Sequence, residues 1–314
     1  MIKSKKPKPK IQNRGKRYRL QDSPFYKLSS KKKLSEILHI SVPELKKISK
    51  NPTYSVFVTT NETGKAREIQ QPVNELDVLH TRIASLLSRI SIPVNIHSGI
   101  KKRSHITNAK QHSGEDKLLT TDIKSFFPST TKEMVFRLFF HDFQMPGDVA
   151  KLLSDVCCYG SAIPTGSRLS MPLAYWANHK MFQEIKSLTE KHNLRFSVYV
   201  DDLTISGDEV TGLLLNTIAK IVRKHGHELH IGKTRIYAKN ETKIVTGVVL
   251  CGSEYNVRNR QLKNIFEDME QWKSVKGTNI EPISLKQRLI GRLSAASQIQ
   301  PSYKDKAKTI INDG

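Results

Sequence analysis

Two adjacent carboxylates, Asp201 and Asp202, lie between short segments in which apolar and polar residues alternate. Residues 195–198 precede them and residues 203–207 follow, and this alternation predicts two strands joined by a hairpin turn. Side chains at a turn can point together, whereas successive residues within a strand face opposite sides. Carboxylate oxygens can hold Mg²⁺ beside a triphosphate for phosphoryl transfer. The same residues could instead form an Asp-rich turn that bonds only to its own backbone.

A third carboxylate, Asp122, ends another short apolar segment, residues 118–121, and is followed by two aromatic residues and a proline. A site that binds two metal ions needs carboxylates from separate elements, because both ions must be bridged. Asp122 beside Asp201 would supply that arrangement. This spacing favours phosphoryl transfer over a plain turn.

These motifs resemble those of the reverse transcriptases. In that family an Asp followed five positions later by an aromatic residue forms one palm motif, as Asp122 and Phe127 do here, and Tyr-x-Asp-Asp forms another, as residues 199–202 do. The resemblance implies an RNA-directed DNA polymerase with an α+β, right-hand fold. We therefore expect fingers, a palm with an antiparallel sheet backed by helices, and a helical thumb.

The resemblance also implies roles for the residues around the carboxylates. Asp122 and Asp201 would hold two Mg²⁺ ions, with the Ile123 carbonyl as a further ligand and Asp202 in a weaker supporting role. The ring of Phe127 would lie beneath the sugar of the incoming nucleotide and would clash with a ribose 2′-hydroxyl. The expected substrates are therefore dNTPs.

Other segments match the nucleotide-binding parts of the family. Residues 54–69 predict two strands and a turn, and Lys65 and Arg67 lie two apart, so they face the same side. The matching fingers hairpin closes over the triphosphate, which assigns both residues to phosphate contact. Gly166 lies in a segment that resembles the family's motif beside the nucleotide, although Thr165 replaces the usual Gln. Lys233 matches a lysine that protonates the departing pyrophosphate.

Two further patterns resemble those of retron reverse transcriptases, bacterial enzymes that copy part of a structured noncoding RNA into a short single-stranded DNA. One is Asn-Ala-x-x-His just before the first palm Asp, and the other is Val-Thr-Gly in an apolar segment. A basic loop that suits a nucleic-acid backbone precedes both. By chemistry alone, a lone histidine is more often a structural residue than a ligand. The RNA-binding candidates are thus Asn108 and His112, Val245, Thr246 and Gly247, and Lys101, Lys102 and Arg103.

The retron resemblance implies a branched RNA–DNA product (msDNA), a cognate noncoding RNA as partner, and a separate effector protein in a system of phage defence. Two alternatives remain open. A generic bacterial or group II intron-like reverse transcriptase would not depend on Val-Thr-Gly. The short segment after the thumb argues against a group II intron-like enzyme, in which further domains follow the thumb. A non-catalytic RNA-binding scaffold would not need intact carboxylates.

Composition agrees with a nucleic-acid partner. The chain has 314 residues and a formal net charge of +23, and its first 33 residues hold 13 Lys/Arg and one acid. Such a balance points to polyanions as partners. The three cysteines have neither disulfide nor zinc-site spacing, which fits a reducing cytoplasm, and no apolar segment is long enough to cross a membrane.

The pattern of apolar residues predicts the elements that would position these motifs. We expect a basic arm over residues 1–33, of which the part up to about Leu20 stays extended or disordered until it meets a partner. Fingers with the start of the palm follow over 34–115, the palm over 116–252 and the thumb over 253–314. Within these regions, the spacing predicts helices over 41–48, 76–90, 173–188, 214–222, 262–272 and 285–296, and one buried strand over 243–250 with a kink at Gly247.

Overall fold

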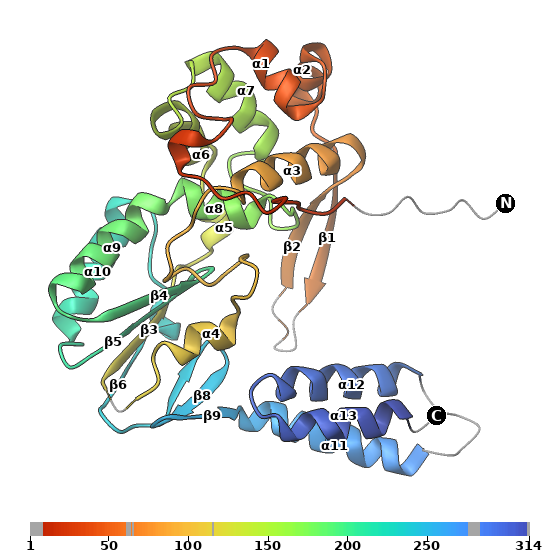
Figure 1. Cartoon of the computed structure of the whole chain (residues 1–314), viewed down its shortest axis with the longest axis vertical. Coiled ribbons are helices and arrows are strands. Elements are labelled where there is room, and N and C mark those ends of the chain that lie inside the picture. Colours follow the sequence, from red (N-terminus) through yellow and green to blue (C-terminus); the bar gives the residue numbers. More distant parts are fainter. Residues whose placement is uncertain (1–8, 61–63, 65, 115, 276–282, 313–314) are drawn as a thin grey trace. The chain divides into compact units, whose positions relative to one another are not determined.

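The structure is a computed structural model that describes residues 9–60, 64, 66–114, 116–275 and 283–312, so Lys65 lies outside the described residues (Figure 1). Helices alternate with antiparallel sheets, which confirms the expected α+β class. The chain forms two compact units, each assembled from three separate segments. The division into arm, fingers, palm and thumb stays a prediction.

One unit contains the chain up to Val94, Ile123–Ser187 and Thr217–His230. It is mainly helical and carries one two-stranded sheet. Its elements are the 3₁₀ turn η1 (Leu20–Asp22), α1 (Lys31–Leu38), α2 (Val42–Lys50), β1 (Tyr54–Thr60), β2 (Ala66–Pro72), α3 (Asn74–Leu87), α5 (Phe126–Ser129), α6 (Lys132–Arg137), the π-helical turn η2 (Leu138–Asp142), α7 (Gly147–Cys157), α8 (Ser170–Ala177), and most of α9 (His179–Lys191) and α10 (Gly212–Lys224).

Local sequence explains where these helices begin and which faces they bury. The hydroxyl of Ser41 and the carboxylate of Glu44 form a capping box at the start of α2. The apolar stripe of α3 is buried, as its spacing predicts. The predicted strands over 54–69 pair in antiparallel register as β1 and β2.

Residues 9–20 differ from the expected free arm. They run along α3, where the Gln12 amide donates to Ser85 Oγ (3.0 Å) and Tyr18 forms a parallel bridge with Ile90. Residues 9–20 are thus held by bonds to the Ser85 hydroxyl and to the main chain near Ile90 within the same unit, and partner binding is not needed to place them.

The single helix predicted over 173–188 is also wrong, because it is divided at Asn178 into α8 and α9. The Asn178 amide donates to Ala174 O (2.9 Å) and to Thr130 Oγ1 (3.0 Å), while its carbonyl oxygen lies 2.7 Å from His227 Nε2. A buried side chain that bonds its own helix end competes with continued helical bonding. The apolar periodicity carries no sign of this break.

The other unit contains Asn95–Asp122, Leu188–Asn216 and Ile231–Gly314. It holds a four-stranded antiparallel sheet of order β4-β5-β3-β6 and a three-stranded sheet β7-β8-β9. Its elements are α4 (His105–Lys110), β3 (Leu118–Asp122), β4 (Arg195–Tyr199), β5 (Asp202–Ser206), the 3₁₀ turn η3 (Ile231–Lys233), β6 (Arg235–Tyr237), β7 (Lys243–Val245), β8 (Val248–Cys251), β9 (Glu254–Val257), α11 (Asn259–Val275), α12 (Ile283–Ser297) and α13 (Ser302–Asn312).

The strand predicted over 243–250 is instead the hairpin β7–β8. Thr246 and Gly247 form its two-residue turn, and both have positive φ, +44° and +86°. Two-residue hairpin turns of this kind match the right-handed twist of the strands. The glycine therefore marks a reversal of the chain and not a kink within one strand.

The last three helices, α11 to α13, form a bundle with its own apolar core that includes Trp272, Leu289 and Leu293. Two of these helices follow the predicted spacing, and α13 was not predicted. The buried carboxylate of Asp268 on α11 accepts from Arg288 and Arg292 on α12 at 2.8 and 2.7 Å. This charged pairing fixes the register of the two helices.

Candidate active site

The hairpin β4–β5 carries two of the three carboxylates. Tyr199 pairs with Asp202, which leaves Val200 and Asp201 as the two-residue turn and confirms the predicted hairpin. Val200 has φ +64°, a conformation that a β-branched residue rarely adopts and that costs on the order of 1–3 kcal/mol. The turn thus holds strained backbone beside the carboxylates.

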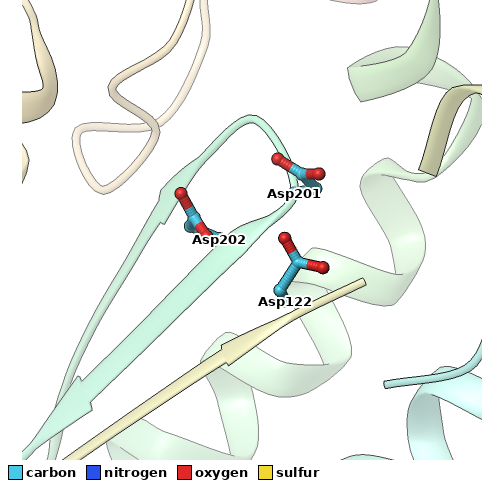
Figure 2. A group of neighbouring side chains, drawn as sticks. All are labelled: Asp122, Asp201 and Asp202. Carbon is cyan, nitrogen blue, oxygen red and sulfur yellow. The ribbon is translucent and has the colours of Figure 1, made fainter. Parts of the chain in front are cut away.

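The three carboxylates converge at one end of the four-stranded sheet. Asp122 is the last residue of β3 and lies opposite Asp202 of β5 in the strand register. One carboxylate oxygen from each of Asp122, Asp201 and Asp202 lies within 4.8 Å of the others. Figure 2 shows the three carboxylates gathered around the end of β3 and the hairpin turn.

This crowding changes how readily the carboxylates ionise. Burial, followed by the charge of Asp122, raises the pKa of Asp201 to about 6. Burial and the charges of Asp201 and Asp122 raise the pKa of Asp202 to about 7. Lys233 partly opposes both shifts, and its ammonium group lies 2.7 Å from Asp122 Oδ2. The cluster is therefore short of positive charge.

The donor set fits a hard divalent cation. Carboxylate oxygens are the ligands that Mg²⁺ prefers, and a bound cation would offset the repulsion that raises these pKa values. Within the described residues no other group of three His, Cys, Asp or Glu side chains has this proximity. The histidines after α10 do not converge, since His225 bonds Glu184 while His227 bonds Ser129 and Asn178. Ile123 directly follows Asp122 in the chain, and its carbonyl as a ligand stays a prediction.

Three of the described residues that are expected to bind the nucleotide belong to the first unit: Arg67, Phe127 and Gly166. Phe126 is buried against Phe182 and His227, whereas the neighbouring Phe127 is only partly buried and keeps part of its ring accessible. Arg67 is exposed on β2. Their contacts with a nucleotide stay predictions, as does that of Lys65.

The loop around Gly166 is fastened to β2. The amide of Gly166 donates to Gln70 O (3.2 Å), and a Cβ at this position would lie 2.8 Å from the same oxygen. The amide of Thr165 donates to the Gln70 side-chain oxygen (2.9 Å), and its hydroxyl lies 2.9 Å from both that oxygen and Glu68 O, to either of which it can donate. The strand β2, therefore, is what excludes any side chain at Gly166. Nothing in the residue pattern around Gln70 signals this contact.

The first retron-like pattern is buried. His112 is 2% exposed, and its two ring nitrogens lie 2.8 and 2.7 Å from the hydroxyls of Ser206 and Ser197 on the carboxylate-bearing hairpin. Burial, followed by the charge of Arg195, lowers the pKa of His112 to about 3, so the ring is neutral. Asn108 is 0% exposed. Both side chains face the interior, and their part in RNA binding stays a prediction.

The second retron-like pattern forms the turn of β7–β8. Val245 is buried, and Thr246 Oγ1 donates to the carbonyl of His105 at the start of α4 (2.7 Å). Thr246 and Gly247 line a pocket of about 200 Å³ together with Asp202 and Lys233. The two patterns are more than 130 positions apart in sequence, but Thr246 of the second bonds α4, the helix that carries Asn108 of the first. The second pattern also shares its pocket with Asp202 of the carboxylate cluster. In the basic loop, Lys101 and Lys102 are exposed, whereas Arg103 Nη1 donates to Ile96 O (2.6 Å).

Comparison with known proteins gives relatives of one kind. No protein-family profile matches the chain. The retron Ec86 reverse transcriptase of Escherichia coli is 25% identical over 257 residues, which cover 80% of each chain. The retron Mx65 enzyme of Myxococcus xanthus is 26% identical over 63% of this chain, and the retron Se72 enzyme of Salmonella heidelberg is 27% identical over 61%. The chain spans about half the length of these last two relatives.

Among solved structures, a foamy viral protease-reverse transcriptase in complex with DNA has a TM-score of 0.49 and 14% identity, covering 82% of this chain and 38% of that one. Among the described helices, none has both the length and the apolar character needed to cross a membrane. Over most of its length the chain is thus similar to several curated bacterial retron reverse transcriptases, which are RNA-directed DNA polymerases.

Proposed function

We propose that the chain copies part of a cognate structured noncoding RNA into a short single-stranded DNA, and that RNA and DNA stay joined as a branched msDNA. The observation that carries this proposal is the cluster of Asp122, Asp201 and Asp202, whose oxygens lie within 4.8 Å of one another. Similarity to several retron reverse transcriptases supports the choice of template and product.

Asp122 and Asp201 would hold Mg²⁺, with the Ile123 carbonyl and Asp202 in support. When bound, two such ions would make the primer hydroxyl more acidic and would neutralise the charge of the triphosphate and of the departing pyrophosphate. The hairpin turn holds the Asp201 carboxylate toward Asp122 before any substrate arrives. A site organised in advance loses little free energy to rearrangement during the reaction.

The remaining residues act on the nucleotide. The bond from Lys233 to Asp122 holds an ammonium group at the cluster, which supports Lys233 as the donor of a proton to the leaving pyrophosphate. Lys65 and Arg67 would contact the phosphates, Gly166 would lie beside the nucleotide, and Phe127 would exclude ribose.

Recognition of the cognate RNA would fall to the exposed Lys101 and Lys102 and to the β7–β8 turn at Thr246 and Gly247. The pocket that this turn shares with Asp202 supports a part in placing the RNA strand that carries the primer. A separate effector protein would complete an anti-phage system, which rests only on the resemblance to retrons.

The deciding experiment expresses the gene with its native flanking sequence and digests the nucleic acid that co-purifies with the protein. We expect a discrete small DNA that shortens with ribonuclease, survives as DNA and is absent from Asp201→Asn, while RNA still co-purifies. Asp208→Asn, which removes an exposed carboxylate of the same unit, should leave the product unchanged. Near wild-type synthesis by Asp201→Asn would overturn the metal assignment, and RNA without any DNA would overturn the retron proposal.

A further inference from the structure

Three arginines gather where the N-terminal arm crosses α3. Arg82 lies on α3, and Arg89 lies two residues beyond the end of α3 at Leu87. Arg14 is presented by a tight turn in which Arg14 and Gly15 both have positive φ, +53° and +69°. The Gly15 amide donates to Asn13 Oδ1 (3.2 Å), which closes that turn. Two elements thus bring three guanidinium groups into one region.

Arg82 and Arg89 both donate to main-chain oxygens, and Arg89 also interacts with the phenol of Tyr18. Arg82 Nε donates to Ile37 O (3.0 Å) and Arg89 Nη2 donates to Gln12 O (3.4 Å). Burial and the positive charges of Arg89 and Arg14 lower the pKa of Arg82, which shows that the three charges act on one another. Among the described residues, no carboxylate forms an ion pair with any of the three.

Arg89 carries a further sign of a missing partner. The residue is only 7% exposed, and its Nε is buried without a hydrogen-bond acceptor among the described residues. A buried donor left without an acceptor costs on the order of 1–3 kcal/mol, and more when it is charged. The nearby phenol of Tyr18 cannot serve as a counter-ion, because burial raises its pKa.

We propose that Arg14 and Arg82, whose side chains are accessible, bind backbone phosphates of the RNA that the enzyme holds, and that the buried Arg89 supports them by holding the arm through Gln12 O. Guanidinium groups match the geometry of phosphate oxygens, to which they can donate two parallel bonds. The arm forms one wall of the site through its bond to Ser85 and its bridge to Ile90. The site shares no residue with the carboxylate cluster. This inference rests on the proposed function only in taking RNA as the bound polymer.

Equilibrium binding tests the site without any DNA synthesis. The probe is a labelled transcript of the region flanking the gene, titrated with the full chain in the absence of dNTPs over a range of salt concentrations. Arg14→Gln and Arg82→Gln should each weaken binding about three- to tenfold, and should lower the slope of log affinity against log salt by about 0.7–0.9. Arg223→Gln removes an exposed guanidinium from α10 and is the matched control.

The buried Arg89 needs a separate variant, because Arg89→Gln could fail to fold. Arg89→Lys keeps the charge and loses the guanidinium bond to Gln12 O that holds the arm, so it should weaken RNA binding while retaining the wild-type melting temperature. Effects no larger than that of Arg223→Gln would overturn the proposal. Stabilisation by inorganic phosphate that is lost in Arg82→Gln, without any change in RNA affinity, would instead show a site for a free anion and would overturn it too. If the variants change RNA binding as expected but the wild-type chain does not extend a primer, only the proposed function is contradicted.

Discussion

The pKa of Asp202 reflects its burial and the repulsion within the carboxylate cluster. Its pKa is about 7 in the folded chain and near 4 in an unfolded one, so the folded state binds the extra proton. The stabilising contribution is complete below about pH 4 and is lost as the pH rises through about 7. Without divalent cations near pH 8, Asp202→Asn should therefore raise the melting temperature by about 2–6 °C.

The measurement is thermal unfolding with and without millimolar MgCl₂. The wild-type protein should gain more from the ion than Asp202→Asn does, because the ion offsets a repulsion that the variant has already lost. Asp208→Asn, which changes an exposed carboxylate, should show neither effect. A variant less stable than wild type near pH 8 would contradict the charge crowding.

Phe127 is the residue on which the choice of sugar depends. Its ring is partly exposed, whereas Phe126 is locked in the core, so only Phe127 can lie against a ligand. Phe127→Ala should reduce the preference for deoxynucleotides over ribonucleotides about tenfold or more in primer extension with single nucleotides. Phe140→Ala, at another exposed phenylalanine of the same unit, is the control. Unchanged selectivity would remove Phe127 from this role.

At the scale of elements, the bonds from Thr165 to Gln70 join the loop of Gly166 to the hairpin β1–β2. Thr165→Val keeps the main-chain bond and removes the hydroxyl, while Gln70→Ala removes the acceptor of both bonds. We expect both to raise the KM for dNTPs several-fold with little change in kcat, because the loop and the hairpin would no longer move together. Thr165→Ser should restore the wild-type KM.

The double variant tests whether the two residues act through one contact. If they do, Gln70→Ala with Thr165→Val should raise the KM hardly more than Gln70→Ala alone. Additive effects, or a loss of stability without any change in KM, would show that the contact only supports the fold.

The elements also show how far the sequence could predict this molecule. Alternating polarity predicts β4–β5 and β1–β2, and apolar spacing predicts α3, α11 and α12, because each of these buries one face. The helix break at Asn178 and the hairpin turn at Thr246–Gly247 could not be predicted, because both involve hydrogen bonds to residues that are distant in sequence. The carboxylates could be identified because their chemistry needs particular residue types. The phosphate site could not, because Arg82 and Arg89 lie within a helix pattern typical of core.

At the scale of the whole molecule, the two compact units make a prediction about unfolding. The chain has two tryptophans, and the structure places Trp176 in the first unit and Trp272 in the core of the α11–α13 bundle in the second. Both are buried, so the fluorescence of each reports on the packing of its own unit. Units with separate cores need not unfold in one transition.

We expect Trp176→Phe and Trp272→Phe, each of which leaves a single tryptophan, to give urea midpoints that differ when followed by fluorescence. Far-ultraviolet circular dichroism of the wild-type protein should then span both transitions, because it reports on helices of both units. The same substitutions followed by circular dichroism control for any stability lost with the indole ring. Coincident midpoints and slopes for the two variants would show that both units unfold together, and would contradict separate cores.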